Sequence, residues 1–171
     1  MLKKTTLEEL KGIPFFGELT WEELRHLAQD LEERDYKKGE TLFKEGDVPG
    51  PLYVIQQGAV EITKKTPTGH RQVIARKETG HFFGELSFFE KRRHSATAKA
   101  LEDTRLVLLN KFTYDDLEKE KPLLVHKLLR EIILTVSANL DSMNDMFLQM
   151  IHYAFYGGKA GKIEMQEENE D

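Results

Sequence analysis

The chain has 171 residues, of which 39% are hydrophobic and 32% are charged, and its formal net charge at pH 7 is −5. This is the size of one domain with an appendage, and the composition is ordinary for a soluble globular protein. The negative net charge weighs against nucleic acid as the main partner, because phosphate backbones are bound by clustered Lys and Arg. The absence of cysteine excludes disulfide bonds and thiolate metal sites, and it is consistent with a reducing compartment.

Neither a membrane span nor a signal peptide is evident in the sequence. No apolar run approaches the ~20 residues that a membrane-spanning helix requires. The first six residues, Met1 to Thr6, lack the apolar core of a signal peptide. We therefore expect a cytoplasmic protein with no membrane partner.

Residues 1–35 are predicted to form N-terminal helices. Thr6 and Thr20 are each followed three residues later by a glutamate, which is the pattern of a capping box. In the residues after Thr20, apolar side chains recur at helical spacing and form one stripe. The segment Gly12–Gly17 interrupts the two helices.

Residues 36–110 change to short apolar or alternating runs separated by turn residues. Examples are the runs at 52–55, 60–63 and 71–75, with a turn at 66–69. Short strands without long helices between them predict an antiparallel sandwich or barrel, and not a parallel sheet with crossover helices.

Residues 111–156 return to a helical period, with a short helix that ends before Pro122 and a long helix from about Leu123 to Phe155. The long helix has apolar residues spaced alternately by four and three, which is the a/d seam of a coiled coil. The seam consists of Leu129, Ile133, Val136, Leu140, Met143, Phe147 and Met150. A second stripe, expected to lie on the sandwich, consists of Leu124, Leu128 and Ile132.

The seam continues beyond the point where one small sandwich could cover it, so we expect a homodimer through residues 123–155. The alternative that remains open is a seam that packs on its own domain. The last segment, residues 157–171, combines glycines with a run of acidic residues. Such a composition cannot bury enough apolar surface to become ordered, which predicts a disordered acidic tail.

Several short motifs, in this order and spacing, resemble the cyclic-nucleotide-binding domain of catabolite-activator-type regulators and protein kinase A regulatory subunits. They are Lys38-Gly39-Glu40, Glu45-Gly46-Asp47, the run from Leu52 to Val60, and Phe83-Gly84-Glu85-Leu86-Ser87. The resemblance covers roughly residues 10–147. It implies a mostly β fold, an antiparallel β jelly roll (double-stranded β-helix) with flanking helices and a long C-terminal helix that often dimerises.

The segment from Phe83 to Ser87 is similar to the phosphate-binding cassette of that family. Glycine lets the backbone approach a ligand, and amides at the start of a short helix suit an anion. The resemblance implies that these amides bind the cyclic phosphate of cAMP or cGMP, and that Glu85 accepts a hydrogen bond from the ribose 2′-hydroxyl. It also places Asn139, counted from Pro122, near the base, although an Asn on the helix surface beside the seam explains that residue equally well.

The candidate ligand-binding residues are therefore Phe83, Gly84, Glu85, Leu86, Ser87, His94, Ser95 and Asn139. His94 departs from the family, which has an arginine about ten positions after the glycine that corresponds to Gly84. Arginine pairs bidentately with phosphate and stays charged, whereas histidine offers one donor and is mostly neutral above ~6.5. The loss of one charge-assisted pair costs ~1.5–3 kcal/mol, which is roughly ten- to a hundredfold in affinity.

Three interpretations of this departure remain open. In the first, cyclic nucleotide still binds weakly, with Arg92 or Arg93 in place of the missing guanidinium. In the second, the pocket binds a different anion, and His94 contributes to its specificity. In the third, the fold is a dimeric interaction module that binds no ligand.

Other functions lack sequence support. No two histidines have the i,i+4 spacing of a ligand pair, so we expect no metal or haem site. The sequence has no nucleophile elbow or Walker loop, so we expect no catalytic residues. The residues after Phe147 contain no helix-turn-helix, so we expect no direct binding of nucleic acid. The sequence thus predicts a regulatory sensor that signals to a separate protein partner through its dimer helix; a ligand-free scaffold is the alternative.

Overall fold

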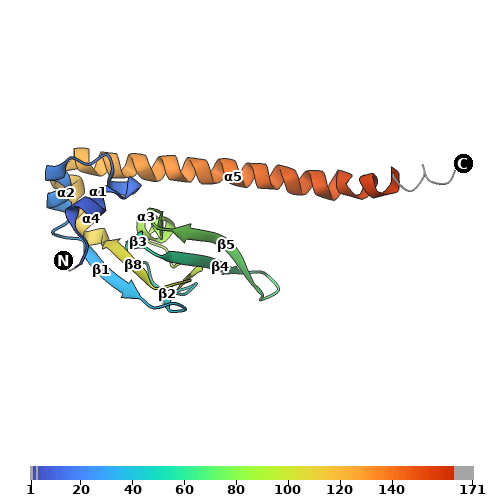
Figure 1. Ribbon diagram of the computed structural model, residues 1–171, viewed down its shortest axis with the longest axis horizontal. Helices are drawn as coiled ribbons and strands as arrows, with labels where there is room; N and C mark the ends of the chain where they lie inside the picture. The colour runs from blue at the N-terminus through green and yellow to red at the C-terminus, as the bar shows by residue number, and fades with distance from the viewer. Residues whose placement is uncertain (1, 3, 164–171) are drawn as a thin grey trace, which may run out of the picture. The chain divides into compact units, whose positions relative to one another are not determined.

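A computed structural model describes residue 2 and residues 4–163 of the chain. Two compact units can be distinguished, of which the first ends at Glu131 and the second begins at Ile132. The first unit contains all the strands and the short helices (Figure 1). No helix in the described part of the chain is both long enough and apolar enough to span a bilayer.

The N-terminal helices are α1 (Leu7–Lys11), η1 (Pro14–Phe16) and α2 (Trp21–Leu27). Both predicted capping boxes are confirmed. The hydroxyl of Thr6 accepts the N–H of Glu9, whose carboxylate accepts the N–H of Thr6, and Thr20 and Glu23 repeat this exchange. A capping side chain typically contributes ~1 kcal/mol, which explains why such short helices begin at these residues.

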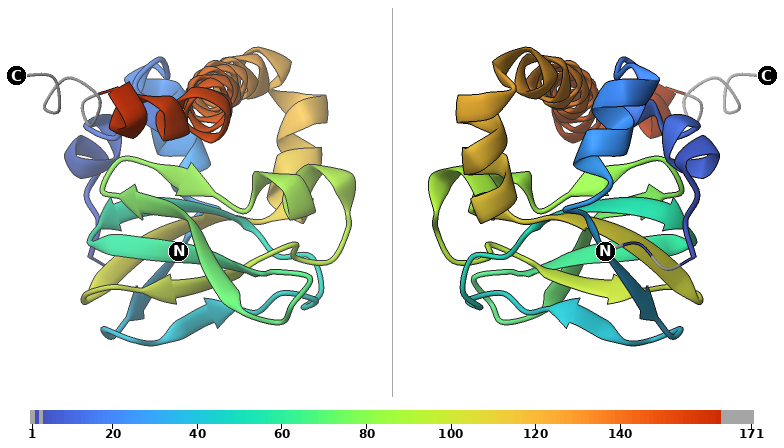
Figure 2. Two further views of the ribbon diagram at one scale, coloured as in Figure 1. Left: turned by 90° about the vertical axis from the view of Figure 1, so that its right-hand side faces the viewer. Right: turned by 90° about the vertical axis from the view of Figure 1, so that its left-hand side faces the viewer.

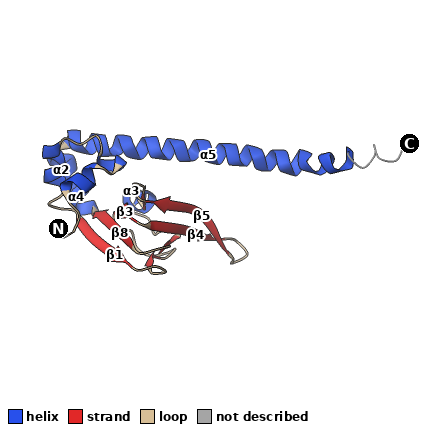
Figure 3. Cartoon of the chain, viewed as in Figure 1, coloured by secondary structure: helices blue, strands red, loops and turns tan. Residues whose placement is uncertain are grey.

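The strands form two four-stranded antiparallel sheets (Figure 3). The first has the order β1-β8-β3-β6, and its strands are β1 (Glu32–Tyr36), β8 (Thr104–Leu109), β3 (Leu52–Gln57) and β6 (Phe82–Phe83). The second has the order β2-β7-β4-β5, and its strands are β2 (Thr41–Phe43), β7 (Thr97–Ala100), β4 (Ala59–Lys65) and β5 (Arg71–Glu78). Together with the flanking helices, these sheets confirm the predicted antiparallel jelly roll.

Strand β1 begins at Glu32, which is earlier than the predicted boundary at residue 36. Its first four residues are all charged and therefore give no apolar alternation. They become a strand because they pair with β8, from Glu32 opposite Leu108 to Tyr36 opposite Thr104. A long-range pairing thus outweighs a local sequence pattern that does not favour a strand.

The main core lies between the two sheets and receives side chains from both. Its members are Phe43, Tyr53, Ile55, Val60, Phe83, Ala98, Leu106 and Leu108. The residues from Leu52 to Ile55 are all buried, so β3 is covered on both faces. The short helices lie on one side of the sandwich (Figure 2), which accounts for a continuous apolar run in place of alternation.

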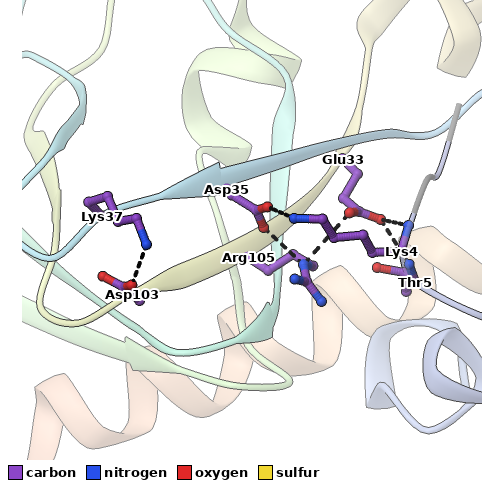
Figure 4. Close-up of polar contacts among 7 residues, drawn as sticks. All are labelled: Lys4, Thr5, Glu33, Asp35, Lys37, Asp103 and Arg105. Carbon is purple, nitrogen blue, oxygen red and sulfur yellow. Dashed lines mark hydrogen bonds and ion pairs between the residues drawn. The ribbon is translucent and has the colours of Figure 1, made fainter.

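A cluster of charged residues fastens the N-terminal segment to β1 (Figure 4). The buried carboxylate of Glu33 accepts the backbone N–H groups of Lys4 and Thr5, at 3.1 and 2.9 Å. The Lys4 ammonium and the Nε of Arg105 both bind the Asp35 carboxylate, the latter at 2.9 Å. Burial alone would raise the pKa of Glu33, but the Thr5 and Lys4 hydrogen bonds and the Arg105 charge hold it below its usual value.

Two helices follow the last strand, α4 (Lys111–Glu120) and α5 (Pro122–Ile163). Both starts agree with the predicted helices. The end of α5 does not agree with the predicted boundary, because helix continues through residues 157–163. Each glycine costs only ~1 kcal/mol relative to alanine, and extending an existing helix avoids the cost of nucleation. The remainder of the predicted acidic tail, 164–171, lies outside the described residues.

The first turns of α5 are apolar on one side. Leu124, Leu128 and Ile132, the members of the second stripe, are buried. The seam residues from Ile133 onward are exposed in the single chain. The helix therefore carries an apolar face that a single copy of the chain leaves in water.

Candidate functional site

The backbone conformation at position 84 favours glycine. This residue follows β6 and precedes α3 (Glu85–Glu90), and it has a left-handed φ of +87°. A Cβ added at this position would lie 2.9 Å from Cδ2 of Tyr53 and 3.2 Å from the carbonyl oxygen of Pro51. Both the conformation and the close approach disfavour any other residue, so glycine is the residue best suited to the turn from β6 into α3.

The start of α3 presents a free carboxylate. Glu85 is half-buried, and no hydrogen bond or ion pair involves its carboxylate in the described part of the chain. The first amides of a helix have no partner within it, so those at the start of α3 are available to an acceptor. Leu86, the next residue, is 45% exposed. A carboxylate beside free amides is suited to a ligand that carries both an anionic group and a hydroxyl.

The side chains of Ser87 and Phe83 are buried. The hydroxyl of Ser87 is buried and donates to the carbonyl oxygen of Gly84 at 3.1 Å. Phe83 is a core residue, whose ring stacks on Tyr53 with the centroids 5.1 Å apart. Because both side chains are engaged in these buried contacts, only the backbone groups of Ser87 and Phe83 remain for a ligand.

The side chain of His94 is packed inside the sandwich. It is 5% exposed, and its ring stacks on Phe43 with the centroids 3.7 Å apart and the planes 13° from parallel. Its Nδ1 lies 3.2 Å from the hydroxyl of Ser87. On its other side, a Cβ added at Gly50 would lie 3.0 Å from Nε2. His94 thus connects the cassette to the core. Its ring occupies the space between Phe43, Ser87 and Gly50.

The backbone of His94 is also fixed. Its N–H donates to the carbonyl oxygen of Asp47 at 2.9 Å, and its carbonyl oxygen accepts the N–H of Gly46 at 2.8 Å. Burial lowers the pKa of His94, and the charge of Asp47 opposes this effect only in part. The imidazole is therefore neutral at neutral pH and brings no positive charge to the cassette.

The two neighbouring guanidinium groups are engaged elsewhere. The Nε of Arg92 lies 2.6 Å from a carboxylate oxygen of Glu90, and Arg93 donates to the carbonyl oxygen of Gly46 at 2.8 Å. Both side chains are largely exposed and long, so each could be released at small cost. If Arg92 or Arg93 is to supply the guanidinium that is missing at position 94, it must first leave these contacts.

The remaining candidate residues are less tightly connected to this site. Ser95 is half-buried and directly follows His94. Asn139 is exposed on α5, in the second unit. The structure therefore brings together Phe83, Gly84, Glu85, Leu86, Ser87 and His94, with Ser95 beside them.

Sequence reasoning missed the aromatic neighbours of His94. Phe43 supplies the stacking surface, and Tyr53 packs against both Gly84 and Phe43. Burial raises the pKa of Tyr53 to about 12, so its hydroxyl stays protonated. No local signal marks these residues, because long-range strand pairing brings them to the cassette. Tyr53 on β3 lies opposite Phe83 on β6, and Phe43 on β2 lies opposite Ala98 on β7, the strand that follows His94.

One further feature of the described residues, a groove, lies away from the cassette. The groove, of about 570 Å³, runs between α2 and the junction of α4 and α5, and no cassette residue lines it. Within the described part of the chain, no group of three or more His, Asp or Glu side chains could hold a metal ion.

Comparison with known proteins places this geometry in a family. The family model described as the cyclic nucleotide-binding domain matches residues 33–120, which is about half of the chain. The chain is 33% identical over 119 residues to the cyclic AMP receptor protein of Thermus thermophilus, which covers 70% of this chain and 55% of that protein. It is 31% identical over 100 residues to the cAMP-dependent protein kinase regulatory subunit of Mycosarcoma maydis, covering 57% of this chain and 19% of that one.

Solved structures agree with the sequence relatives. A cyclic nucleotide-binding domain from Methylobacillus flagellatus superimposes with a TM-score of 0.75 at 27% identity, over 84% of this chain and 81% of that one. The chain spans only about half, or less, of the length of these curated relatives. With the fold, the cassette and the family match in agreement, the chain belongs to the family of cyclic nucleotide-binding domains.

Proposed function

We propose that the chain is a regulatory sensor domain that binds a cyclic nucleotide, or a related small anion, weakly at the cassette. The domain then signals to a separate protein partner through a dimer of α5. It performs no catalysis and does not bind nucleic acid directly. Each step of this proposal rests on a separate feature of the two units.

The observation that carries the proposal is the turn at Gly84. A left-handed glycine opens α3 beside the free carboxylate of Glu85, which leaves amides and a carboxylate on one surface. The amides and the positive end of the helix favour an anion, and the carboxylate accepts a hydroxyl. A cyclic nucleotide offers both groups, as a phosphate and a ribose 2′-hydroxyl. By name, the relatives from Thermus and Mycosarcoma respond to cyclic AMP, which supports the same ligand class here.

The proposal of weak binding follows from His94. Its ring is buried, neutral and hydrogen-bonded to Ser87, so it offers the ligand no charge. A missing charge-assisted pair costs ~1.5–3 kcal/mol, or roughly ten- to a hundredfold in affinity. Arg93 recovers part of this binding energy if its guanidinium leaves the Gly46 carbonyl oxygen and pairs with the ligand. Otherwise the ligand is one that needs less positive charge in its site.

Signalling is proposed to use the exposed seam of α5. Exposed Ile133, Leu140 and Phe147 lie at the spacing that a second helix of the same kind would cover. A ligand changes such an interface only through its different affinities for two arrangements. Asn139, which lies next to Leu140, is the residue proposed to contact the ligand from α5.

Calorimetric titration with cyclic AMP and cyclic GMP, at up to millimolar concentration, tests the ligand proposal. The wild-type protein should bind weakly, and His94→Arg should bind roughly ten- to a hundredfold more tightly. His70→Arg is the matched control, because it adds the same charge on the exposed turn between β4 and β5 and should leave affinity unchanged. Absence of heat for both the wild-type protein and a folded His94→Arg would refute the ligand proposal.

A second function is favoured by a specific observation. Ser87 and His94 satisfy each other inside the sandwich, and Phe43 covers the ring, so the cassette is held together without a ligand. A ligand-free dimeric interaction module would have this property. This second function predicts no calorimetric signal for the wild-type protein or for His94→Arg. It also predicts an oligomeric state that cyclic nucleotide does not change.

A further inference from the structure

The character of α5 changes along its length. The a positions of the seam are Ile133, Leu140 and Phe147, and the d positions are Leu129, Val136, Met143 and Met150. This register fixes which residues flank the seam, since e and g positions lie on either side of it. The flanks of the first heptads differ from the flanks of the last.

In the first heptads the flanking positions are polar. They are Ser137 and Asn144 at e and Asn139 at g. Although Leu134 at b is 51% exposed, these polar e and g residues leave a narrower apolar stripe than the last heptads have, and a single partner helix covers its a and d residues. This part of α5 fits the proposed dimer.

In the last heptads the flanking positions are apolar. They are Met146 and Tyr153 at g, which are 63% and 79% exposed, and Ile151 at e. Two exposed residues at b, Leu148 and Phe155, widen the surface further. From residue 146 to residue 155 the only polar groups are those of Gln149 and His152 and the hydroxyl of Tyr153, and the segment contains no Asp, Glu, Lys or Arg. We call this segment the distal face.

The distal face is wider than one partner helix can cover. In a two-stranded coil the a and d residues are buried, while e and g stay at the surface and commonly carry charges. Apolar e and g residues enlarge the stripe to the broad face that helices present in a four-helix bundle. A dimer would therefore leave Met146, Tyr153 and Leu148 in water, around the buried Phe147 and Met150.

We propose that two α5 dimers associate through residues 146–155, so that the distal faces of four copies of the chain form one bundle. This proposal rests on the proposed dimer. The same apolar face is present on every copy and continues the seam directly, so identical chains supply complementary surfaces. The distal face carries no charge that would select a partner of opposite sign. Methionine side chains are flexible enough to fill the irregular spaces of such a bundle.

A lipid surface is the competing occupant of an exposed apolar helix. Helices that lie on membranes carry Lys and Arg on their polar face, and residues 146–155 contain neither. The polar groups of the segment are those of Gln149 and His152 and the hydroxyl of Tyr153 alone. The chemistry therefore favours other copies of the chain over a membrane.

Mass measurement by light scattering on the eluting full chain, at micromolar concentration, tests the proposal. The wild-type particle should have four times the mass of the chain. The double variant Met146→Glu, Ile151→Glu, which charges both flanks of the distal face, should have half the mass of the wild-type particle. Gln149→Glu is the matched control, because it adds the same charge at a c position of the same turns and should keep the wild-type mass.

The outcomes separate the two proposals. A wild-type particle of two chains overturns the four-helix inference and leaves the dimer in place. A monomer overturns both. A wild-type dimer that co-floats with neutral or anionic phospholipid vesicles, while the double variant does not, would assign the distal face to lipid and also overturn the inference.

Discussion

At the scale of single residues, the ring of His94 connects the cassette to the core without carrying charge. Arginine in the same position would bring a permanent charge, which is stable only beside an anion. The stack on Phe43 and the contact with Ser87 suit a neutral ring. The protonation of this one side chain should therefore affect the stability of the domain.

Stability should fall in mild acid because of His94. Burial lowers its pKa in the folded state, so the unfolded chain takes up the proton first. The contribution of the neutral ring is thus complete above the unfolded pKa of ~6.5 and is lost as the pH falls through it toward the folded pKa. Thermal unfolding between pH 8 and pH 5 should show a smaller decrease for His94→Phe, which keeps an aromatic ring and cannot titrate. Parallel pH profiles would contradict this assignment.

Gly84→Ala should destabilise the protein by about 1–3 kcal/mol, because a left-handed residue gains strain and the new Cβ meets Tyr53. Gly69→Ala is a sharp control: this glycine has the same φ of +87° and no atom within 4 Å of the added Cβ. It should cost only about 1 kcal/mol, from strain alone. Urea unfolding measures both changes, and equal losses would show that the close approach at Gly84 is unimportant.

At the scale of elements, a cluster of charged groups holds the segment that precedes α1 against β1. The Glu33 carboxylate accepts two backbone N–H groups, and Arg105 bridges from β8 to the acidic residues of β1 (Figure 4). Hydrogen bonds to a buried carboxylate are stronger than neutral ones. Removing the charge of Glu33 should therefore weaken both β1 and the segment that precedes α1.

Glu33→Gln should cost about 1–3 kcal/mol at pH 7, because the amide loses the charge that the N–H groups and Arg105 favour. The folded pKa of Glu33 is lowered, so its contribution is complete above the unfolded value of ~4.3 and is lost as the pH falls toward the folded pKa. The difference between wild type and variant in urea unfolding should therefore shrink between pH 7 and pH 3. Glu102→Gln, at an exposed position, serves as the control and should change stability by less than ~0.5 kcal/mol.

The elements that the sequence predicts well are those fixed by near neighbours. The capping boxes at Thr6 and Thr20 and the periodicity of α5 involve residues within a few turns, and the structure confirms them. The start of β1 is missed because only its pairing with β8 makes the charged residues a strand. The cassette is recognisable as a motif, but the burial of His94 against Phe43 depends on two distant strands and leaves no local trace.

At the scale of the whole molecule, the chain combines a sandwich with a helix that exposes apolar residues. Exposed apolar side chains at heptad spacing remain costly until another helix covers them. If α5 is paired, its stability depends on protein concentration, because dissociation and unfolding of the helix are linked. A helix that is stable by itself would show no such dependence.

The seam can therefore be tested through the thermal melting of the helix. Circular dichroism at 222 nm should give a wild-type melting midpoint for α5 that rises over about a hundredfold increase in protein concentration, as mass action requires. Leu140→Glu places a charge at the centre of the seam and should abolish this rise. Ser142→Glu introduces the same charge at an exposed c position, so the rise should persist. If the wild-type midpoint is independent of concentration, the seam is not an interface between copies, and the proposed route from ligand to partner through α5 fails with it.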